Sequence, residues 1–146
     1  MKKDEEALLY FADSFNCSQS VFTVFGKACG LEEDVCLKIA TPFGAGMGRQ
    51  QLTCGAVTGA LMAIGLHFGR AAGDDVSKRL ETYAKTNEFF VEFTRLHGTA
   101  ECRALLGGLN MNDPADHQKI VDMNLFRTVC DKCVRDAVLI VESLIG

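Results

Sequence analysis

Apolar residues recur at helical spacing along almost the whole chain, and no other pattern limits its fold so strongly. The first example is Ala7, Leu8, Phe11 and Phe15, which follow the i, i+3, i+4 spacing of one helix face. Nowhere do apolar and polar residues alternate over a bounded run between turn residues, the pattern that predicts a strand. A length of 146 residues suits one hydrophobic core. We therefore expect an all-α fold, a single-domain bundle of about six to eight helices over residues 1–146.

Caps and helix breakers divide the chain into predicted helices. Asn16 is a favoured N-cap residue, Pro42 ends a helix, and Asp113 followed by Pro114 begins one. The longest amphipathic pattern predicts a helix over 74–97 whose buried face contains Val76, Leu80, Tyr83, Ala84, Phe90, Val91, Phe93 and Leu96. The other predicted helices span 4–15, 17–29, 32–41, 52–68, 101–106, a segment after Asp113, and 125–144.

The charge of the chain argues against one class of partner. Acidic residues outnumber basic residues by 19 to 15, which gives a formal net charge of −4, and Lys and Arg form no cluster. Proteins that bind nucleic acid neutralise its phosphates with such clusters. We therefore expect no nucleic-acid partner.

The uncharged stretch 50–69 raises the question of a membrane span, because about 20 residues cross a bilayer. The stretch contains five polar side chains and several small residues near its centre, so we interpret it as a buried core helix. At the N-terminus an acidic run directly follows Lys2 and Lys3, without the apolar region of a signal peptide. We therefore expect a cytoplasmic protein with no stable membrane span.

The chain contains seven cysteines, a high number for an intracellular protein of this size. Because the number is odd, at least one thiol stays free or pairs with another chain. Structural disulfides are rare in a reducing compartment, where cysteines are more often metal ligands, catalytic groups or redox sensors. The cysteines are therefore the first candidates for function.

Three cysteines are predicted to lie at helix N-termini, where amide groups and the helix dipole favour a thiolate. Cys17 follows the N-cap Asn16, and Cys54 lies near the start of a helix, with Arg49 nearby in sequence. Cys102 lies near the start of a short helix and precedes Arg103. A thiolate is both the nucleophile of disulfide exchange and the form that binds metal. The alternative is that each cysteine is a small buried apolar residue.

The remaining cysteines differ in their sequence context. Cys130 and Cys133 form a C-x-x-C inside a helical pattern, so their side chains share a face and could meet one metal or each other. No second C-x-x-C and no thioredoxin-like strand accompany them. Cys29 and Cys36 are interpreted as packing residues of the core. The three histidines are interpreted as structural or solvated.

A glycine-rich loop precedes Cys54. Glycines at alternate positions, with another one after Cys54, suit positive φ or a close approach of the backbone to a bound group. The predicted cofactor-contacting residues are therefore Gly44, Gly46, Gly48 and Gly55. The loop is not the G-x-G-x-x-G of dinucleotide-binding folds, and no strand precedes it.

The segment Cys54-Gly55-Ala56-Val57-Thr58-Gly59, together with Cys17, Cys102 and Cys130, resembles the C…GCAxxG…C…C pattern of a family of redox-active proteins. The resemblance covers nearly the whole chain, and it implies a redox role for these four cysteines. Cys133 lies outside the pattern. A similar region occurs in split-Soret cytochromes, where an iron–sulfur centre is associated with it. The resemblance thus implies that the four thiolates, with Cys133 as a further candidate, could hold an iron–sulfur cluster or zinc.

Three interpretations remain open at this point. The first is a redox protein in which Cys17, Cys54, Cys102 and Cys130 converge, either to exchange thiol and disulfide states or to hold an electron-transfer centre that serves an unknown redox partner protein. The second is a non-redox binding module whose Gly/Ala-rich helix forms a pocket or a homodimer interface. The third is a structural zinc protein. Covalent c-type haem is not supported, because Val134 rather than histidine follows Cys133.

Overall fold

The computed structural model describes residues 1–146, and its regular elements are all helical. The all-α fold predicted from periodicity is confirmed, with seven helices of eight or more residues and a few single turns. The elements are α1 (Lys3–Ala12), α2 (Cys17–Ala28), α3 (Glu33–Ala40), the 3₁₀ turn η1 (Thr41–Phe43), α4 (Gly44–Met47), α5 (Gly55–Phe68), α6 (Ser77–His97), α7 (Cys102–Leu105), α8 (Pro114–Asp122), α9 (Leu125–Thr128) and α10 (Cys130–Ile145). No helix is both long enough and apolar enough to cross a membrane.

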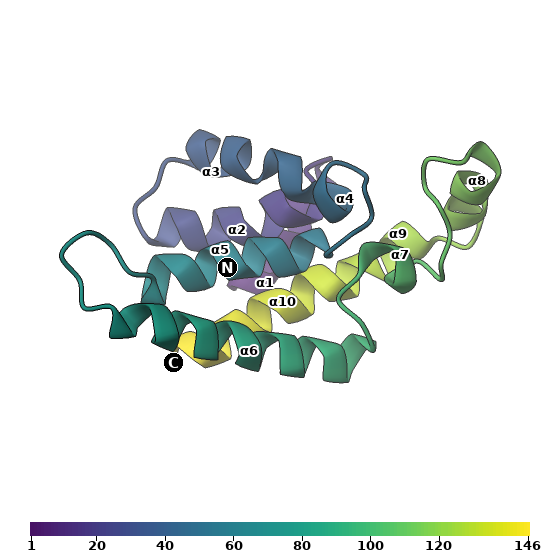
Figure 1. Ribbon diagram of the computed structural model, residues 1–146. Helices are drawn as coiled ribbons and strands as arrows, with labels where there is room; N and C mark the ends of the chain where they lie inside the picture. The colour runs from purple at the N-terminus through teal and green to yellow at the C-terminus, as the bar shows by residue number, and fades with distance from the viewer.

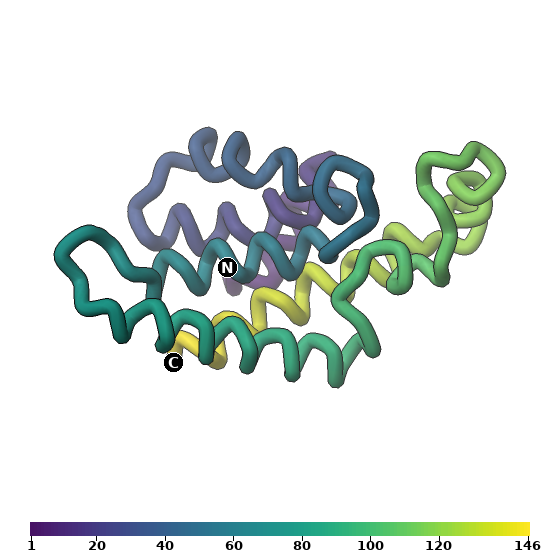
Figure 2. The backbone as a smooth tube through the Cα atoms, viewed as in Figure 1, coloured from purple at the N-terminus to yellow at the C-terminus, as the bar shows by residue number.

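Three helices, α2, α5 and α10, pack against one another at the centre of the bundle (Figure 1). α1 lies against α2 and α10, α3 covers α2 on the outside, and α6 packs on α5 and α10. Figure 2 shows that α8 stands apart at one end of the molecule, and α9 connects it to α10. The main core fills the space between the packed helices with residues such as Phe25, Ile64, Phe89 and Val138.

The contact between α2 and α5 depends on small residues. A Cβ atom on Gly59 would lie 2.7 Å from the backbone oxygen of Ser18, so the two backbones approach too closely for any side chain there. The Gly/Ala face of α5 is therefore buried within the chain against α2. A homodimer remains a prediction, but this face is not free to form its interface.

The start of α2 is fixed by a capping box. The side chain of Asn16 accepts a hydrogen bond from the Gln19 amide, and the Gln19 side chain accepts one from the Asn16 amide, both at 2.9 Å. Asn16 Nδ2 also donates to the carbonyl of Thr41 at 3.0 Å, which ties the start of α2 to η1. These bonds hold Cys17, the first residue of α2, in a fixed place.

One predicted helix begins later in the structure, and another is divided in two. The helix predicted over 52–68 begins only at Gly55, because Leu52 to Cys54 is extended and pairs with the segment before α7. The Cys54 amide donates to Ala100 and the Cys102 amide to Leu52, both at 2.7 Å. The helix predicted over 125–144 is divided at Val129 into α9 and α10. Both changes place a cysteine at a helix start.

The buried face predicted for the long helix is wrong at most of its residues, although Phe93 is buried as predicted and Phe90 packs against the core. Leu80, Tyr83 and Val91 are 64%, 58% and 70% exposed, and Val76 and Leu96 also face solvent. The buried residues of α6 are Phe89 and Phe93. The reason is that α6 lies at the edge of the bundle and packs mainly on α5 and α10. One narrow stripe of it is therefore covered.

Candidate functional site: a cavity lined by five cysteines

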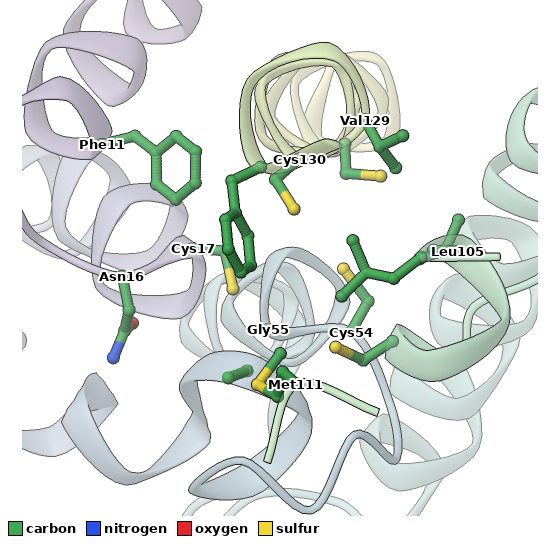
Figure 3. Close-up of a pocket in the computed structure, with 14 residues that line it drawn as sticks. Phe11, Asn16, Cys17, Cys54, Gly55, Leu105, Met111, Val129 and Cys130 are labelled. Atoms are coloured by element: carbon green, nitrogen blue, oxygen red, sulfur yellow. The ribbon is translucent and has the colours of Figure 1, made fainter. Parts of the chain in front are cut away.

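Five of the seven cysteines line one cavity of about 190 Å³, which we call the cysteine cavity (Figure 3). Four of them stand at helix starts: Cys17 opens α2, Cys54 precedes α5, Cys102 opens α7 and Cys130 opens α10. The cavity is lined by Phe11, Asn16, Cys17, Ala45, Cys54, Gly55, Cys102, Leu105, Leu106, Met111, Phe126, Val129, Cys130 and Cys133. The structure thus places the four cysteines of the sequence pattern together and adds Cys133.

The cavity lies between two apolar clusters. Cys54 and Cys133 belong to the main core, whereas Cys102 belongs to a small cluster with Leu106, Met111 and Ile120. The buried side chain of Gln51 connects the two sides, because it donates to the Leu109 carbonyl and accepts from the Met111 amide, each at 2.9 Å. The segment 102–126 therefore forms a wall that is anchored to the backbone preceding Cys54.

The glycine-rich loop forms a left-handed turn beside Cys17. Ala45 to Arg49 all have positive φ, including 54° at Ala45 and 70° at Met47. For residues other than glycine this conformation costs about 1–2 kcal/mol each, so packing and hydrogen bonds must hold it. The Gly48 amide closes the turn on the Gly44 carbonyl at 2.9 Å. As a result, the Ala45 amide donates a hydrogen bond to the sulfur of Cys17.

The predicted cofactor-contacting glycines have different structural roles. Only Gly55 lines the cavity, and a Cβ atom there would lie 2.3 Å from the Cys17 sulfur. A Cβ on Gly44 would overlap the Asn16 side chain, and one on Gly46 would overlap the backbone at Gln51. Gly48 adopts positive φ in the turn. Close packing therefore accounts for Gly44 and Gly46, and only Gly55 is placed to contact a group in the cavity.

Cys54 is the one cysteine whose pKa the cavity lowers. The largest cause is a hydrogen bond donated by the Cys133 thiol, and the amides of Ala56 and Val57 at the start of α5 donate two more. Burial opposes these effects but does not outweigh them. The prediction that a helix start favours a thiolate therefore agrees with the structure at Cys54. Arg49 has no part in lowering this pKa.

For Cys17 and Cys102 the prediction of a lowered pKa is wrong, because their pKa values are raised. Amides of Ala45, Ser18 and Cys17 itself donate to the Cys17 sulfur, but burial and the neighbouring Cys54 charge raise its pKa to about 11. Burial and the same charge raise the pKa of Cys102 to about 12. Burial also raises the pKa of Cys130. One thiolate in a closed apolar space thus keeps its neighbours protonated.

Cys133 is the partner of Cys54. Its hydrogen bond to Cys54 is the largest cause that raises its own pKa, and burial and the Cys54 charge act in the same direction. A proton on Cys133 therefore stabilises the anion on Cys54. The pair consists of one thiolate and one thiol, and both side chains line the cavity.

These pKa shifts predict a loss of stability in alkali. A thiol with a raised folded-state pKa keeps a proton that the unfolded chain loses above about pH 8.5, so the free energy of unfolding falls as pH rises through that range. Cys17, Cys102, Cys130 and Cys133 act in this direction, whereas the lowered pKa of Cys54 stabilises the fold above the unfolded pKa. Each raised thiol contributes a slope of about 1.4 kcal/mol per pH unit between the two pKa values.

Urea denaturation of the reduced protein between about pH 8 and about pH 10.5 measures this slope. The variant Cys102→Ala serves as the control. It lacks one thiol of raised pKa, so its free energy of unfolding should fall less steeply with pH, by about 1.4 kcal/mol per pH unit. Equal slopes in the parent and in Cys102→Ala would contradict a raised pKa at Cys102.

Thiolates are the ligands of iron–sulfur and zinc sites, but the side chains of this cavity are not arranged to hold an ion. Nowhere in the chain do three or more His, Cys, Asp or Glu side chains form a group that fits a metal. No such group accompanies the metal-ligand role predicted for these five cysteines, and that role stays a prediction.

Two residues that the sequence did not single out lie next to Cys133: His97 contacts its sulfur, and Asp136 contacts His97. His97, interpreted as structural or solvated, has its Nδ1 3.9 Å from the Cys133 sulfur. Its Nε2 lies 2.9 Å from a carboxylate oxygen of Asp136, one helical turn after Cys133. The i, i+3 spacing of Cys133 and Asp136 was visible in the sequence, but nothing local indicated that the end of α6 meets α10 there.

The two cysteines outside the cavity differ. Cys36 is fully buried between α2 and α3, which confirms its interpretation as a core residue. Cys29 is exposed at the end of α2, so the same interpretation of Cys29 is wrong. It lies 3.7 Å from His67 Nε2. The cause is that α2 ends at Ala28, where the chain turns away from the core towards α3.

The comparisons with known proteins agree with the cysteine pattern. A family model described as "Putative redox-active protein (C_GCAxxG_C_C)" matches residues 15–144, which include every cysteine of the cavity. No curated protein and no solved structure matches the chain significantly.

Proposed function

The chain belongs to the C_GCAxxG_C_C family of redox-active proteins, and from that premise we propose that it is a thiol–disulfide redox protein with Cys54 as its nucleophile and Cys133 as the resolving cysteine. One observation carries the proposal: Cys54 and Cys133 line the same apolar cavity, and Cys54 is the one cysteine there whose pKa is lowered, with Cys133 as the largest cause. The thiolate is the nucleophile of disulfide exchange, and a resolving thiol must lie in contact with it.

The exchange takes two steps. The Cys54 thiolate attacks one sulfur of a substrate disulfide, forms a mixed disulfide and releases the other sulfur as a thiolate. Cys133 then loses its proton and attacks the Cys54 sulfur, which expels the second substrate thiolate and leaves a Cys54–Cys133 disulfide. The substrate gains two electrons and the cysteine pair loses two. A reducing dithiol reverses both steps.

The other residues of the cavity define what it admits. Its lining is almost entirely apolar, with Phe11, Leu105, Met111 and Phe126 among the lining residues. The protonated thiols of Cys17, Cys102 and Cys130 add no charge. Such a lining favours a small uncharged disulfide or the apolar surroundings of a disulfide on a partner protein over a charged molecule such as oxidised glutathione.

The proposal is tested by equilibrating the protein in buffers of graded ratio of oxidised to reduced dithiothreitol, followed by quenching and counting of thiols in the unfolded chain. We expect the count to fall from seven to five in a single reversible step, because one pair is oxidised. A count of seven at every ratio would contradict the proposal.

The same preparation separates the proposal from the cluster alternative. Protein purified without oxygen should show no visible absorption and no stoichiometric iron, because the proposed site is a pair of thiols without a metal. Broad absorption near about 400 nm with stoichiometric iron would replace disulfide exchange by a cysteine-ligated electron-transfer centre. Stoichiometric zinc, with loss of the fold on chelation, would favour the structural alternative.

A further inference from the structure

A second cavity lies on the other side of the Cys133 helix turn. This outer cavity has a volume of about 410 Å³ and is lined by Leu96, His97, Ala104, Leu105, Thr128, Val129, Lys132 and Asp136. Leu105 and Val129 also line the cysteine cavity, so the two spaces are separated by little more than these side chains. His97 lies at the boundary: it lines the outer cavity and contacts Cys133.

The cysteine cavity contains no group that could take a proton from Cys133 other than sulfur. Its lining has no carboxylate, no amine and no imidazole. Resolution of a mixed disulfide requires that Cys133 lose its proton, and at that stage Cys54 is already bonded to the substrate sulfur and cannot accept it. Apart from the substrate thiolates that the exchange releases, the acceptor nearest to Cys133 is therefore a residue outside the cavity lining.

His97 has the position and the orientation for this transfer. Its Nδ1 faces the Cys133 sulfur at 3.9 Å, and its Nε2 faces Asp136 at 2.9 Å, without the alignment of a full hydrogen bond. A carboxylate beside Nε2 favours the proton on that nitrogen and leaves Nδ1 free to accept. The side chains of His97 and Asp136 are only 11% and 16% exposed, so the pair is held in place by the protein.

We propose that His97 is the general base that accepts the Cys133 proton during the second step of exchange, and that Asp136 is the positioning residue that orients the imidazole. The inference rests on the proposed disulfide exchange. The proton moves from Cys133 Sγ to His97 Nδ1 as the new sulfur–sulfur bond forms and the substrate thiolate leaves. It then passes to water in the outer cavity. The charged groups near His97 are Asp136 and Lys132, and Arg135 Nε lies 3.4 Å from a carboxylate oxygen of Asp136.

The test follows the two steps separately in the Cys29→Ser background, which removes the exposed thiol. The probe is dithiodipyridine, a small uncharged disulfide that releases one coloured thiol at each step. In His97→Asn we expect an unchanged first phase and a second phase slower by about 100-fold or more, the usual contribution of a general base. Imidazole or higher pH should restore the second phase in part, and Asp136→Asn should slow it less.

The control is His67→Asn, which changes the histidine beside Cys29 and should leave both phases unchanged. An unchanged second phase in His97→Asn would overturn the inference, and so would an equal slowing of both phases, because that would indicate a structural role. If His97→Asn does not fold, a solvent isotope effect confined to the second phase of the parent protein supports the inference, and its absence overturns it. Failure of the proposed function itself is distinguishable, since the parent would then release no second thiol.

Discussion

Replacement of Cys54 by serine is expected to slow the reaction of the cavity with dithiodipyridine by about 100-fold or more, measured at neutral pH in the Cys29→Ser background. The reason is that no other cavity thiol is ionised to a useful extent. A thiol with the pKa of about 11 found for Cys17 is a thiolate in roughly one molecule in ten thousand at pH 7. The pKa values of Cys102 and Cys130 are raised as well.

The matched control is Cys36→Ala, which removes a fully buried thiol outside the cavity and should leave the rate unchanged.

The variant Cys133→Ser should behave differently from Cys54→Ser and from Cys36→Ala. It should retain the first phase but form a lasting mixed disulfide at Cys54, because no resolving thiol remains. A Cys54→Ser variant that reacts at the parent rate would show that another cysteine is the nucleophile.

Replacement of Gly59 by alanine is expected to lower the free energy of unfolding by about 1–3 kcal/mol, the cost of inserting one methyl group where no space exists. The new Cβ would lie 2.7 Å from the Ser18 carbonyl oxygen, a backbone atom that can move only with α2. For a chain of this size the loss corresponds to a lower Tm by about 2–4 °C per kcal/mol.

Gly65→Ala is the matched control, because Gly65 lies in the same helix and a Cβ there meets no atom within 4 Å. It should stabilise the protein by about 0.5–1 kcal/mol through the higher helix propensity of alanine. In thermal unfolding, the Tm should therefore fall in Gly59→Ala and rise in Gly65→Ala. If Gly59→Ala were as stable as the parent, the close contact of α2 and α5 would not be needed for the fold.

The starts of the two helices that have a side-chain cap could be predicted from the sequence, because caps act locally. Asn16 caps α2, and Asp113 caps α8 by accepting from the Asp116 amide at 3.0 Å, as the sequence indicated. Both interactions span three residues, so the amino-acid pattern alone contains them. The same local signal placed Cys17 at the first residue of its helix.

Burial and pKa could not be predicted in the same way, because they depend on residues distant in sequence. Periodicity predicts that α6 is a helix, but its buried stripe is decided by α5 and α10. The amide groups at a helix start are present at Cys17 as well as at Cys54, yet the two pKa values move in opposite directions. The difference comes from Cys133, which is 79 residues from Cys54 in the sequence and is the largest cause of the lowered pKa of Cys54.

The left-handed turn at 45–49 shows a third limit. Its glycines indicate positive φ, but Ala45, Met47 and Arg49 share that conformation against their own preference. The chain around them holds the turn, since the Leu52 amide donates to Gly46 at 3.1 Å and the Asn112 side chain donates to the Arg49 carbonyl at 2.9 Å. As a result, the Ala45 amide donates a hydrogen bond to the Cys17 sulfur, and no local sequence pattern indicates this contact.

The pairing of Cys54 with Cys133 is tested most directly by peptide mass spectrometry of the oxidised protein after its free thiols are alkylated. Trypsin places Cys54 in the peptide 50–70, Cys133 in 133–135 and Cys130 in 128–132, so the cysteines of the C-x-x-C are separated. We expect one disulfide-linked product that joins 50–70 to 133–135, with Cys17, Cys102 and Cys130 alkylated. A link between 50–70 and any other peptide, or no link at all, would contradict the assignment of Cys133 as the resolving cysteine.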